Sequence, residues 1–307
     1  MSQKRPTSLL VVVLCLVGLG AAVYYGINQV TEDIGTDVPG VKAPASGLEL
    51  RAAIEKGDVA AVESVLRRGV NADEPLESGR GAMTPLMAAS AAGTTDVLKA
   101  LLKAGANANA RTGEGRTALM FASGWGTAAC VQALIDAGAR QNERSDDGMT
   151  PLMFAAARGE MDSVNALRNA GADINARNKW GQTALMAAAI AGDASKISVL
   201  LTAGANVNEV DRDGMTAANL AACADTKAAA DALKTLLDAK ADPNVGNSEG
   251  VTPLMNAANR ADAEKVAVLL ASGANKTAKD KAGQTAADWA ASRDDEPGRA
   301  LAESLRK

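Results

Sequence analysis

A short motif returns at nearly constant spacing along most of this chain. In its fullest form it reads Thr-Pro-Leu-Met-Ala-Ala. The 33 residues between one motif and the next are too few to bury an apolar core of their own, so such units must stack on their neighbours. The sequence therefore predicts an elongated stack of units. The motif begins, at intervals of 33, 33, 33, 33, 36 and 33 residues, at Thr84, Thr117, Thr150, Thr183, Thr216, Thr252 and Thr285.

Each part of the unit has a local physical role. The threonine hydroxyl can cap the free N–H groups at the start of a first helix, and proline suits the first helical position. A second helix carries paired apolar residues such as Leu101 and Leu102, which we expect to be buried. Glycines such as Gly105 and Gly115 suit the left-handed backbone that ends this helix and turns the next loop.

The period and the Thr-Pro-Leu motif resemble the ankyrin repeat family over residues 48–307. The resemblance implies an all-α solenoid of about eight helix pairs. The pairs are joined by short β-turn fingers, meaning the loops between the second helix of one unit and the first helix of the next. It also implies that proteins are bound through the finger tips and the concave face of the first helices.

Several segments depart from the repeat. Residues 48–71 predict an N-terminal capping helix pair with a charged outer face, and the hairpin after it is longer at 73–82. The repeat that begins at Thr216, the sixth when the capping pair is counted as the first, has three extra residues around 224–230. Lys240 in this repeat stands where glycine is expected. We expect this repeat to be the least stable part of the stack, and the charged residues 293–307 to cap the C-terminal end.

Histidine, which usually follows Thr-Pro-Leu in this family, is absent from the whole chain. One interpretation is that methionine fills the space at each helix start. The other is a flexible binding surface or a site of oxidation. The first is favoured. The residues concerned are Met87, Met120, Met153, Met186, Asn219, Met255 and Asp288.

Composition argues against several functions. The net charge of −4 and the lack of histidine disfavour nucleic-acid binding, metal binding and general-base catalysis. The pairs Asp146–Asp147, Asp211–Asp213 and Asp294–Asp295 lie in predicted loops or in the cap, where solvated carboxylates are ordinary. We therefore expect no catalytic residue, no cofactor and no metal site. Cys130 and Cys223 are three repeats apart, too far for a disulfide.

The N-terminus predicts membrane insertion. Lys4 and Arg5 precede the uncharged run 9–27, which is long enough to span a bilayer and carries two tyrosines near its far end. We expect residues 1–8 in the cytoplasm, a signal-anchor helix at 9–27 and a flexible linker at 28–47. A cleaved signal peptide is the alternative, and both place the repeats outside the cytoplasm.

The predicted membrane helix also has small residues at four-residue spacing, at Gly18, Ala22 and Gly26. This pattern allows a homodimer, although small residues are common in such helices. The anchor and the alanine-rich repeats favour a single-pass bacterial inner-membrane protein with the solenoid in the periplasm.

The predicted fingers contain arginines at 33-residue spacing: Arg111, Arg144 and Arg177. A row of guanidinium groups would suit an acidic protein surface. The alternative is that these arginines pair within the chain with Glu114, Asp146 or Asp147.

Aromatic residues add a second candidate surface. Trp180 is expected at a finger tip, where no core requires it. Trp125, at the end of a first helix, would form an apolar concave patch with Phe121 and Phe154, unless the rings are buried between helices. Trp289 is expected to cover the core of the last repeat.

These features favour a membrane-tethered scaffold that binds a protein partner. The alternative is an exported guard or inhibitor protein that masks one enzyme or toxin. An enzyme is disfavoured, because a solenoid finger provides no cleft with two carboxyl groups in opposed environments.

Overall fold

The computed structural model describes residues 47–226 and 228–307. The predicted cytoplasmic tail at 1–8, membrane helix at 9–27 with Gly18, Ala22 and Gly26, and almost all of the linker at 28–47 lie outside the described residues. Among the described residues, no helix is both long enough and apolar enough to cross a membrane. The unit Ala45–Lys307 is compact by its own internal contacts and is described by itself.

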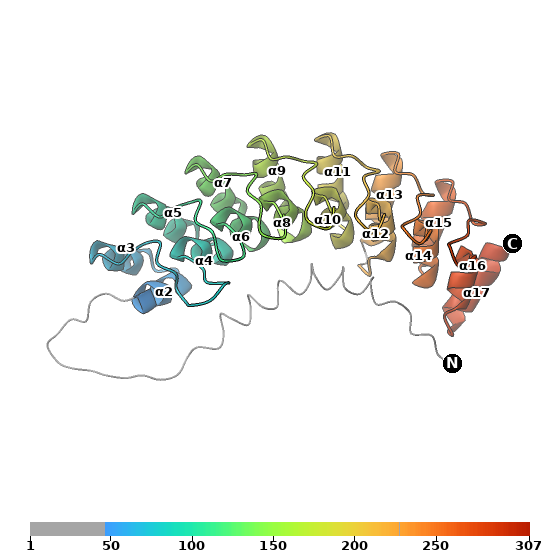
Figure 1. Cartoon of the computed structure of the whole chain (residues 1–307), viewed down its shortest axis with the longest axis horizontal. Coiled ribbons are helices and arrows are strands. Elements are labelled where there is room, and N and C mark those ends of the chain that lie inside the picture. The colour runs from blue at the N-terminus through green and yellow to red at the C-terminus, as the bar shows by residue number, and fades with distance from the viewer. Residues whose placement is uncertain (1–46, 227) are drawn as a thin grey trace. The chain divides into compact units, whose positions relative to one another are not determined.

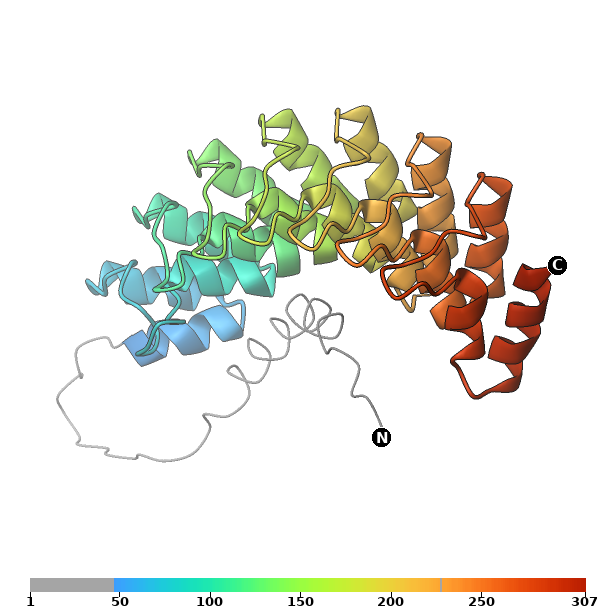
Figure 2. The ribbon, with the colours of Figure 1, turned by 45° about the vertical axis from the view of Figure 1, so that its right-hand side comes forward.

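The described residues form sixteen helices and no β-strand, which confirms the stack of helix pairs. Within this unit the first helices lie side by side along the inner side of an arc and the second helices along its outer side (Figures 1 and 2). The helices are α2 (Gly47–Glu55), α3 (Val59–Arg67), α4 (Pro85–Ala92), α5 (Thr95–Lys103), α6 (Ala118–Trp125), α7 (Ala128–Asp136), α8 (Pro151–Arg158), α9 (Met161–Asn169), α10 (Ala184–Ala191), α11 (Ala194–Thr202), α12 (Ala217–Cys223), α13 (Ala229–Asp238), α14 (Pro253–Asn259), α15 (Ala263–Ala271), α16 (Ala286–Ala291) and α17 (Glu296–Arg306).

The motif threonines start the first helices as predicted. In all seven repeats the hydroxyl oxygen accepts the N–H of the residue three positions later, at 3.2 to 3.4 Å. In two repeats that residue completes the cap: Asn219 and Asp288 each accept the threonine N–H at 3.0 Å. These caps satisfy N–H groups that a helix start otherwise leaves unpaired.

The methionines of the motif are core residues. Their side chains are at most 1 % exposed, which confirms the space-filling interpretation and leaves no methionine surface for a partner. The sulfur atoms of Met87 and Met255 also lie 3.5 and 3.4 Å from the N–H of their own threonines, as weak acceptors.

Small residues let the first helices pack closely. The alanine five positions after each motif threonine is fully buried in every repeat. The apolar pairs of the second helices were expected to be buried as pairs, but in most of them only the first residue is buried and the second lies at the margin of the core. Leu269 is fully buried, for example, whereas Leu270 is 39 % exposed. Leu236 and Leu237 of α13 are both buried.

The fingers are joined edge to edge by their backbones. The N–H of Asp146 donates to the carbonyl oxygen of Glu114 at 3.0 Å. In the next pair of fingers, the N–H of Lys179 donates to the carbonyl oxygen of Asp147 at 2.9 Å. Gly115 permits this approach. A Cβ atom there would lie 2.9 Å from the Asp146 nitrogen, and its φ of 73° also favours glycine.

The extra residues of the sixth repeat lie between α12 and α13, as predicted. The next repeat closes this loop. Lys265 is 2 % exposed, and its ammonium group donates to the carbonyl oxygens of Ala222, at 3.5 Å, and Ala224. The Asp262 carboxylate lies 3.3 Å from the same group. Lys240 ends α13 with a left-handed φ of 70°, where other repeats have glycine.

Candidate interaction surface

The three finger arginines form an internal ladder. Arg111 donates from Nη2 to the carbonyl oxygen of Arg144 at 2.9 Å, Arg144 donates to that of Arg177, and Arg177 donates to that of Val210 at 2.6 Å. Each bond joins equivalent positions 33 residues apart. The series ends at Val210, which has no guanidinium group. These side chains therefore tie the fingers to one another.

The ladder also has carboxylate partners, but not the expected ones. Arg111 pairs with Glu143 at 2.6 Å, and Arg177 pairs with Glu209. No carboxylate pairs with Arg144 in the described part of the chain, where Ala176 takes the corresponding place. The three acids expected to pair with the ladder contact other residues: Glu114 with Arg116, Asp146 with Arg80 and Asp147 with Lys179.

A second ladder, made of side-chain amides, was not predicted. The Oδ1 atom of Asn109 accepts the N–H of Arg140 at 2.9 Å, and its Nδ2 donates to the carbonyl oxygen of Gly138 at 3.1 Å. Recurrence of asparagine at the 33-residue period is the signal that could have revealed it. The members with both bonds are Asn109, Asn142, Asn175, Asn208 and Asn244.

Trp180 lies in a finger and is partly exposed. Its carbonyl oxygen accepts the N–H of Arg212 at 2.9 Å, so the backbone belongs to the edge-to-edge contacts. The ammonium of Lys179 lies 4.6 Å from the ring centroid. The equivalent position in four other fingers is acidic: Glu114, Asp147, Asp213 and Glu249.

The expected aromatic patch of Trp125, Phe121 and Phe154 is wrong for the two phenylalanines, because both are buried. Phe121 and Phe154 are only 2 % and 3 % exposed, because the rings pack between adjacent first helices and under Trp125. Trp125 is half-buried, with its ring centroid 6.0 Å from that of Phe121 and 5.6 Å from that of Phe154. The Arg158 guanidinium lies 5.9 Å from the Trp125 ring. The surface offered to a partner is therefore the outer part of Trp125, with the two phenylalanines as its support.

Burial changes the interpretation of Asp211. Asp211, expected to be solvated, is 6 % exposed, and it accepts the N–H groups of Asp213 and Met215 at 3.0 and 2.9 Å. Burial raises the pKa of this carboxyl group above its ordinary value. Cys130 and Cys223 are buried free thiols. Trp289 is partly exposed, and its Nε1 donates to Asp280 at 2.8 Å.

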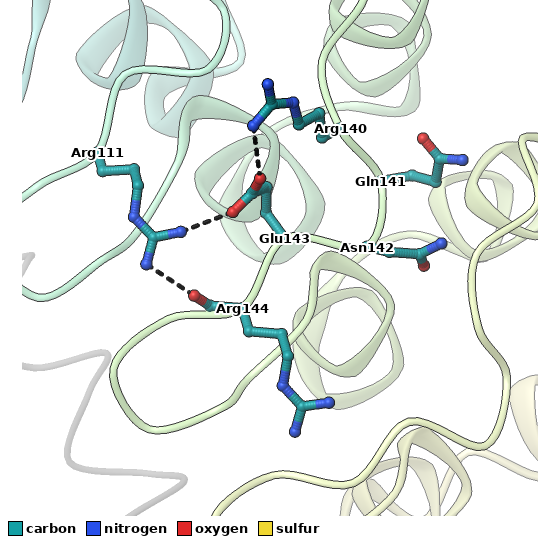
Figure 3. A pocket seen from close by; sticks show the side chains of 6 residues that line it. All are labelled: Arg111, Arg140, Gln141, Asn142, Glu143 and Arg144. Carbon is teal, nitrogen blue, oxygen red and sulfur yellow. Dashed lines mark hydrogen bonds and ion pairs between the residues drawn. The ribbon is translucent and has the colours of Figure 1, made fainter.

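A shallow depression of about 490 Å³ is lined by the loop between α7 and α8 and by Arg111 of the loop between α5 and α6 (Figure 3). Glu143 lies at its centre. One carboxylate oxygen accepts from Arg111 at 2.6 Å and the other from Arg140 at 3.2 Å. The lining residues are Arg111, Arg140, Gln141, Asn142, Glu143 and Arg144.

Comparison with known proteins agrees with this geometry. A family model described as "Ankyrin repeats (3 copies)" matches residues 50–145, 86–178, 152–247 and 221–304. The solved ankyrin repeat domain of human ASB11 is similar, with 28 % sequence identity, 73 % of this chain and 98 % of that chain covered, and a TM-score of 0.66. No curated protein matches the chain. The repeats, the caps and these matches together place the chain in the ankyrin repeat family.

Proposed function

We propose that this chain is a protein-interaction scaffold whose recognition surface combines Trp125 on the concave face with Trp180 on a finger. The observation that carries the proposal is the partial exposure of two large aromatic side chains at positions where most equivalent residues are small or charged. Exposed tryptophans supply a large apolar contact area at low cost in side-chain entropy, and they are enriched among the residues that dominate binding energy.

The packing around each tryptophan supports a prearranged surface. Trp125 is held by two buried rings, and the Trp180 ring lies against the Lys179 ammonium on a backbone that is bonded to Arg212. Side chains already held in position lose less freedom on binding, which favours affinity. Trp125 ends α6 and Trp180 lies in the finger before α10, so we expect a partner that lies across several repeats.

We further propose that residues 9–27 tether this scaffold to a membrane, with the repeats on the side opposite the short basic tail. Support comes from the length of the uncharged run and from Lys4 and Arg5 before it. A protease added to sealed spheroplasts should degrade the repeats only if they face outward. Complete protection of the repeats in intact spheroplasts would contradict this orientation.

The recognition surface is tested by affinity capture with the full-length chain. Trp125→Ala and Trp180→Ala should each lower the yield of specific partners, because each removes a partly exposed aromatic anchor. Trp289→Phe is the matched control, since this tryptophan is also partly exposed but lies in the last repeat. Unchanged recovery of the same proteins by both alanine variants would refute the surface. One partner at equal stoichiometry would favour a guard protein over a scaffold.

A further inference from the structure

Arg140 breaks a loop pattern that the other repeats keep. Two residues after the helix-ending glycine or its substitute, six repeats carry asparagine or aspartate. In each of the six, the side-chain oxygen accepts the N–H of the residue two positions later, at 2.8 to 3.3 Å. This contact stabilises a tight turn. The six residues are Asn71, Asn107, Asp173, Asn206, Asp242 and Asn275.

Arginine cannot make that contact, because its side chain has no acceptor. The Arg140 side chain instead is 73 % exposed and turns toward Glu143 (Figure 3). Arg111 approaches the same carboxylate, so that two guanidinium groups share one acid. Arg144, the neighbouring residue, brings a third guanidinium to the depression and pairs with no carboxylate in the described residues. The lining therefore carries two positive charges that its own acid does not neutralise.

The loop around Glu209, two repeats later, shows the same positions without the arginines at 140 and 144. Glu209 stands at the position equivalent to Glu143 and pairs with Arg177, as Glu143 does with Arg111. Asn206 and Val210 occupy the places of Arg140 and Arg144. At the positions equivalent to Arg111, Arg140, Glu143 and Arg144, the chain therefore has one arginine, Arg177, for one acid, Glu209. The excess of guanidinium groups is thus a property of the loop around Glu143 and not of the repeat.

We propose that the depression lined by Arg111, Arg140 and Arg144 binds a carboxylate from an acidic segment of the protein partner, and that Glu143 occupies this place in the free protein. The inference rests on the proposed scaffold function and names the chemistry of its partner. Guanidinium groups bind carboxylates through paired hydrogen bonds, and two acceptor oxygens of one carboxylate match two such groups. A carboxylate from the partner would replace Glu143 between Arg140 and the Nη1 side of Arg111, whose Nη2 stays on the finger ladder. Arg144 also stays on that ladder and adds a positive charge at the edge of the depression.

The test uses a fluorescein-labelled hexaglutamate peptide and fluorescence anisotropy with the full-length chain. Arg140→Asn should weaken binding about fivefold, the effect of losing one partly exposed ion pair. Arg144→Ala should weaken it about twofold, because it removes a nearby positive charge and no direct contact. Glu143→Ala should tighten it by a similar factor, because the internal competitor is removed. Arg140→Asn introduces the asparagine that four other repeats carry at this position, so its unfolding midpoint should not fall.

Two matched controls separate the site from general charge. Glu209→Ala makes the same charge change beside the same kind of arginine, and Arg67→Ala removes an exposed arginine of α3. Both should leave peptide affinity within about twofold. The proposal is overturned if Glu209→Ala tightens binding as much as Glu143→Ala, or if Arg140→Asn equals Arg67→Ala. It is also overturned if inorganic phosphate displaces the peptide where chloride of equal ionic strength does not, since the site would then prefer phosphate.

The two proposals fail separately. Loss of the hexaglutamate effect would leave the capture experiment with the Trp125 and Trp180 variants unaffected. Conversely, unchanged capture by those variants would refute the tryptophan surface without altering the peptide measurements.

Discussion

The side-chain amide of Asn175 donates to the carbonyl oxygen of Gly204 at 3.0 Å, across the boundary between two repeats. The oxygen of the same amide accepts the N–H of Asn206 at 2.9 Å. One side chain thus satisfies a carbonyl at the end of a helix and an N–H at the start of a loop. Four other asparagines do the same along the stack, so these amides are part of the interface that a single repeat lacks.

Replacing Asn175 with alanine should lower the free energy of unfolding by about 2 kcal/mol, since two hydrogen bonds of about 1 kcal/mol each are lost. Urea denaturation followed by circular dichroism measures the change. Asn169→Ala, at an exposed position at the end of α9, is the control and should change stability by less than about 0.5 kcal/mol. Equal losses for the two variants would show that the amide does not connect the repeats.

Lys240→Gly should stabilise the protein by about 1 kcal/mol. The lysine holds a φ of 70°, a left-handed conformation that costs a side chain energy and glycine almost none. Its carbonyl oxygen still accepts from Asn208, because the backbone is unchanged. Lys234→Gly, within α13, should instead destabilise by about 1 kcal/mol. Thermal unfolding should therefore move in opposite directions for the two variants.

Phe154→Ala should lower the free energy of unfolding by about 3–5 kcal/mol, because the ring is 3 % exposed and its removal leaves a cavity. Trp125→Ala should cost less, since that ring is already half in solvent. Chemical denaturation of both variants provides the comparison. A larger loss for Trp125→Ala would mean that the tryptophan is mainly a core residue, and its role in recognition would lose support.

Stability should fall in alkaline solution partly through Cys223. Burial raises the pKa of this thiol from 9.0 to about 12. The unfolded chain therefore loses the proton first, and the free energy of unfolding decreases as pH rises from about 9 toward 12. Cys223→Ala should flatten this part of the profile, while below pH 8 the slopes of the two proteins should coincide. Identical alkaline slopes would show that the Cys223 thiol does not cause the loss of stability.

Much of this fold could be predicted because the responsible signals are local. A threonine cap, a glycine turn and a small residue between helices each need one residue type at one position. The contacts between repeats were harder to predict. Arg111 binds the carbonyl oxygen of Arg144, and every residue has a carbonyl, so the sequence gives no sign of that acceptor. For this reason the carboxylate partners expected for the arginines were the wrong ones.

In the candidate site, too, single residues could be identified from the sequence, whereas contacts between repeats could not. Trp125 and Trp180 stand out in the sequence because aromatics are rare in this chain. The burial of Phe121 depends on how three rings pack across two helices, which spacing alone does not reveal. Arg140 could have been found by aligning the loops between helices as carefully as the threonine motifs. Its importance, however, depends on the approach of Arg111 from another repeat.

The buried ammonium of Lys265 has a practical consequence for shortening the protein. It reaches back from the seventh repeat to the end of α12 in the sixth, beneath the lengthened connection between α12 and α13. A truncated protein that ends after α13 would lack Lys265, so the carbonyl groups of Ala222 and Ala224 would lose their ammonium donor. The three extra residues between α12 and α13 would then lose this contact with the rest of the stack. Stable fragments should therefore end either before Thr216 or after α15, so that the sixth and seventh repeats are kept or discarded as a single piece.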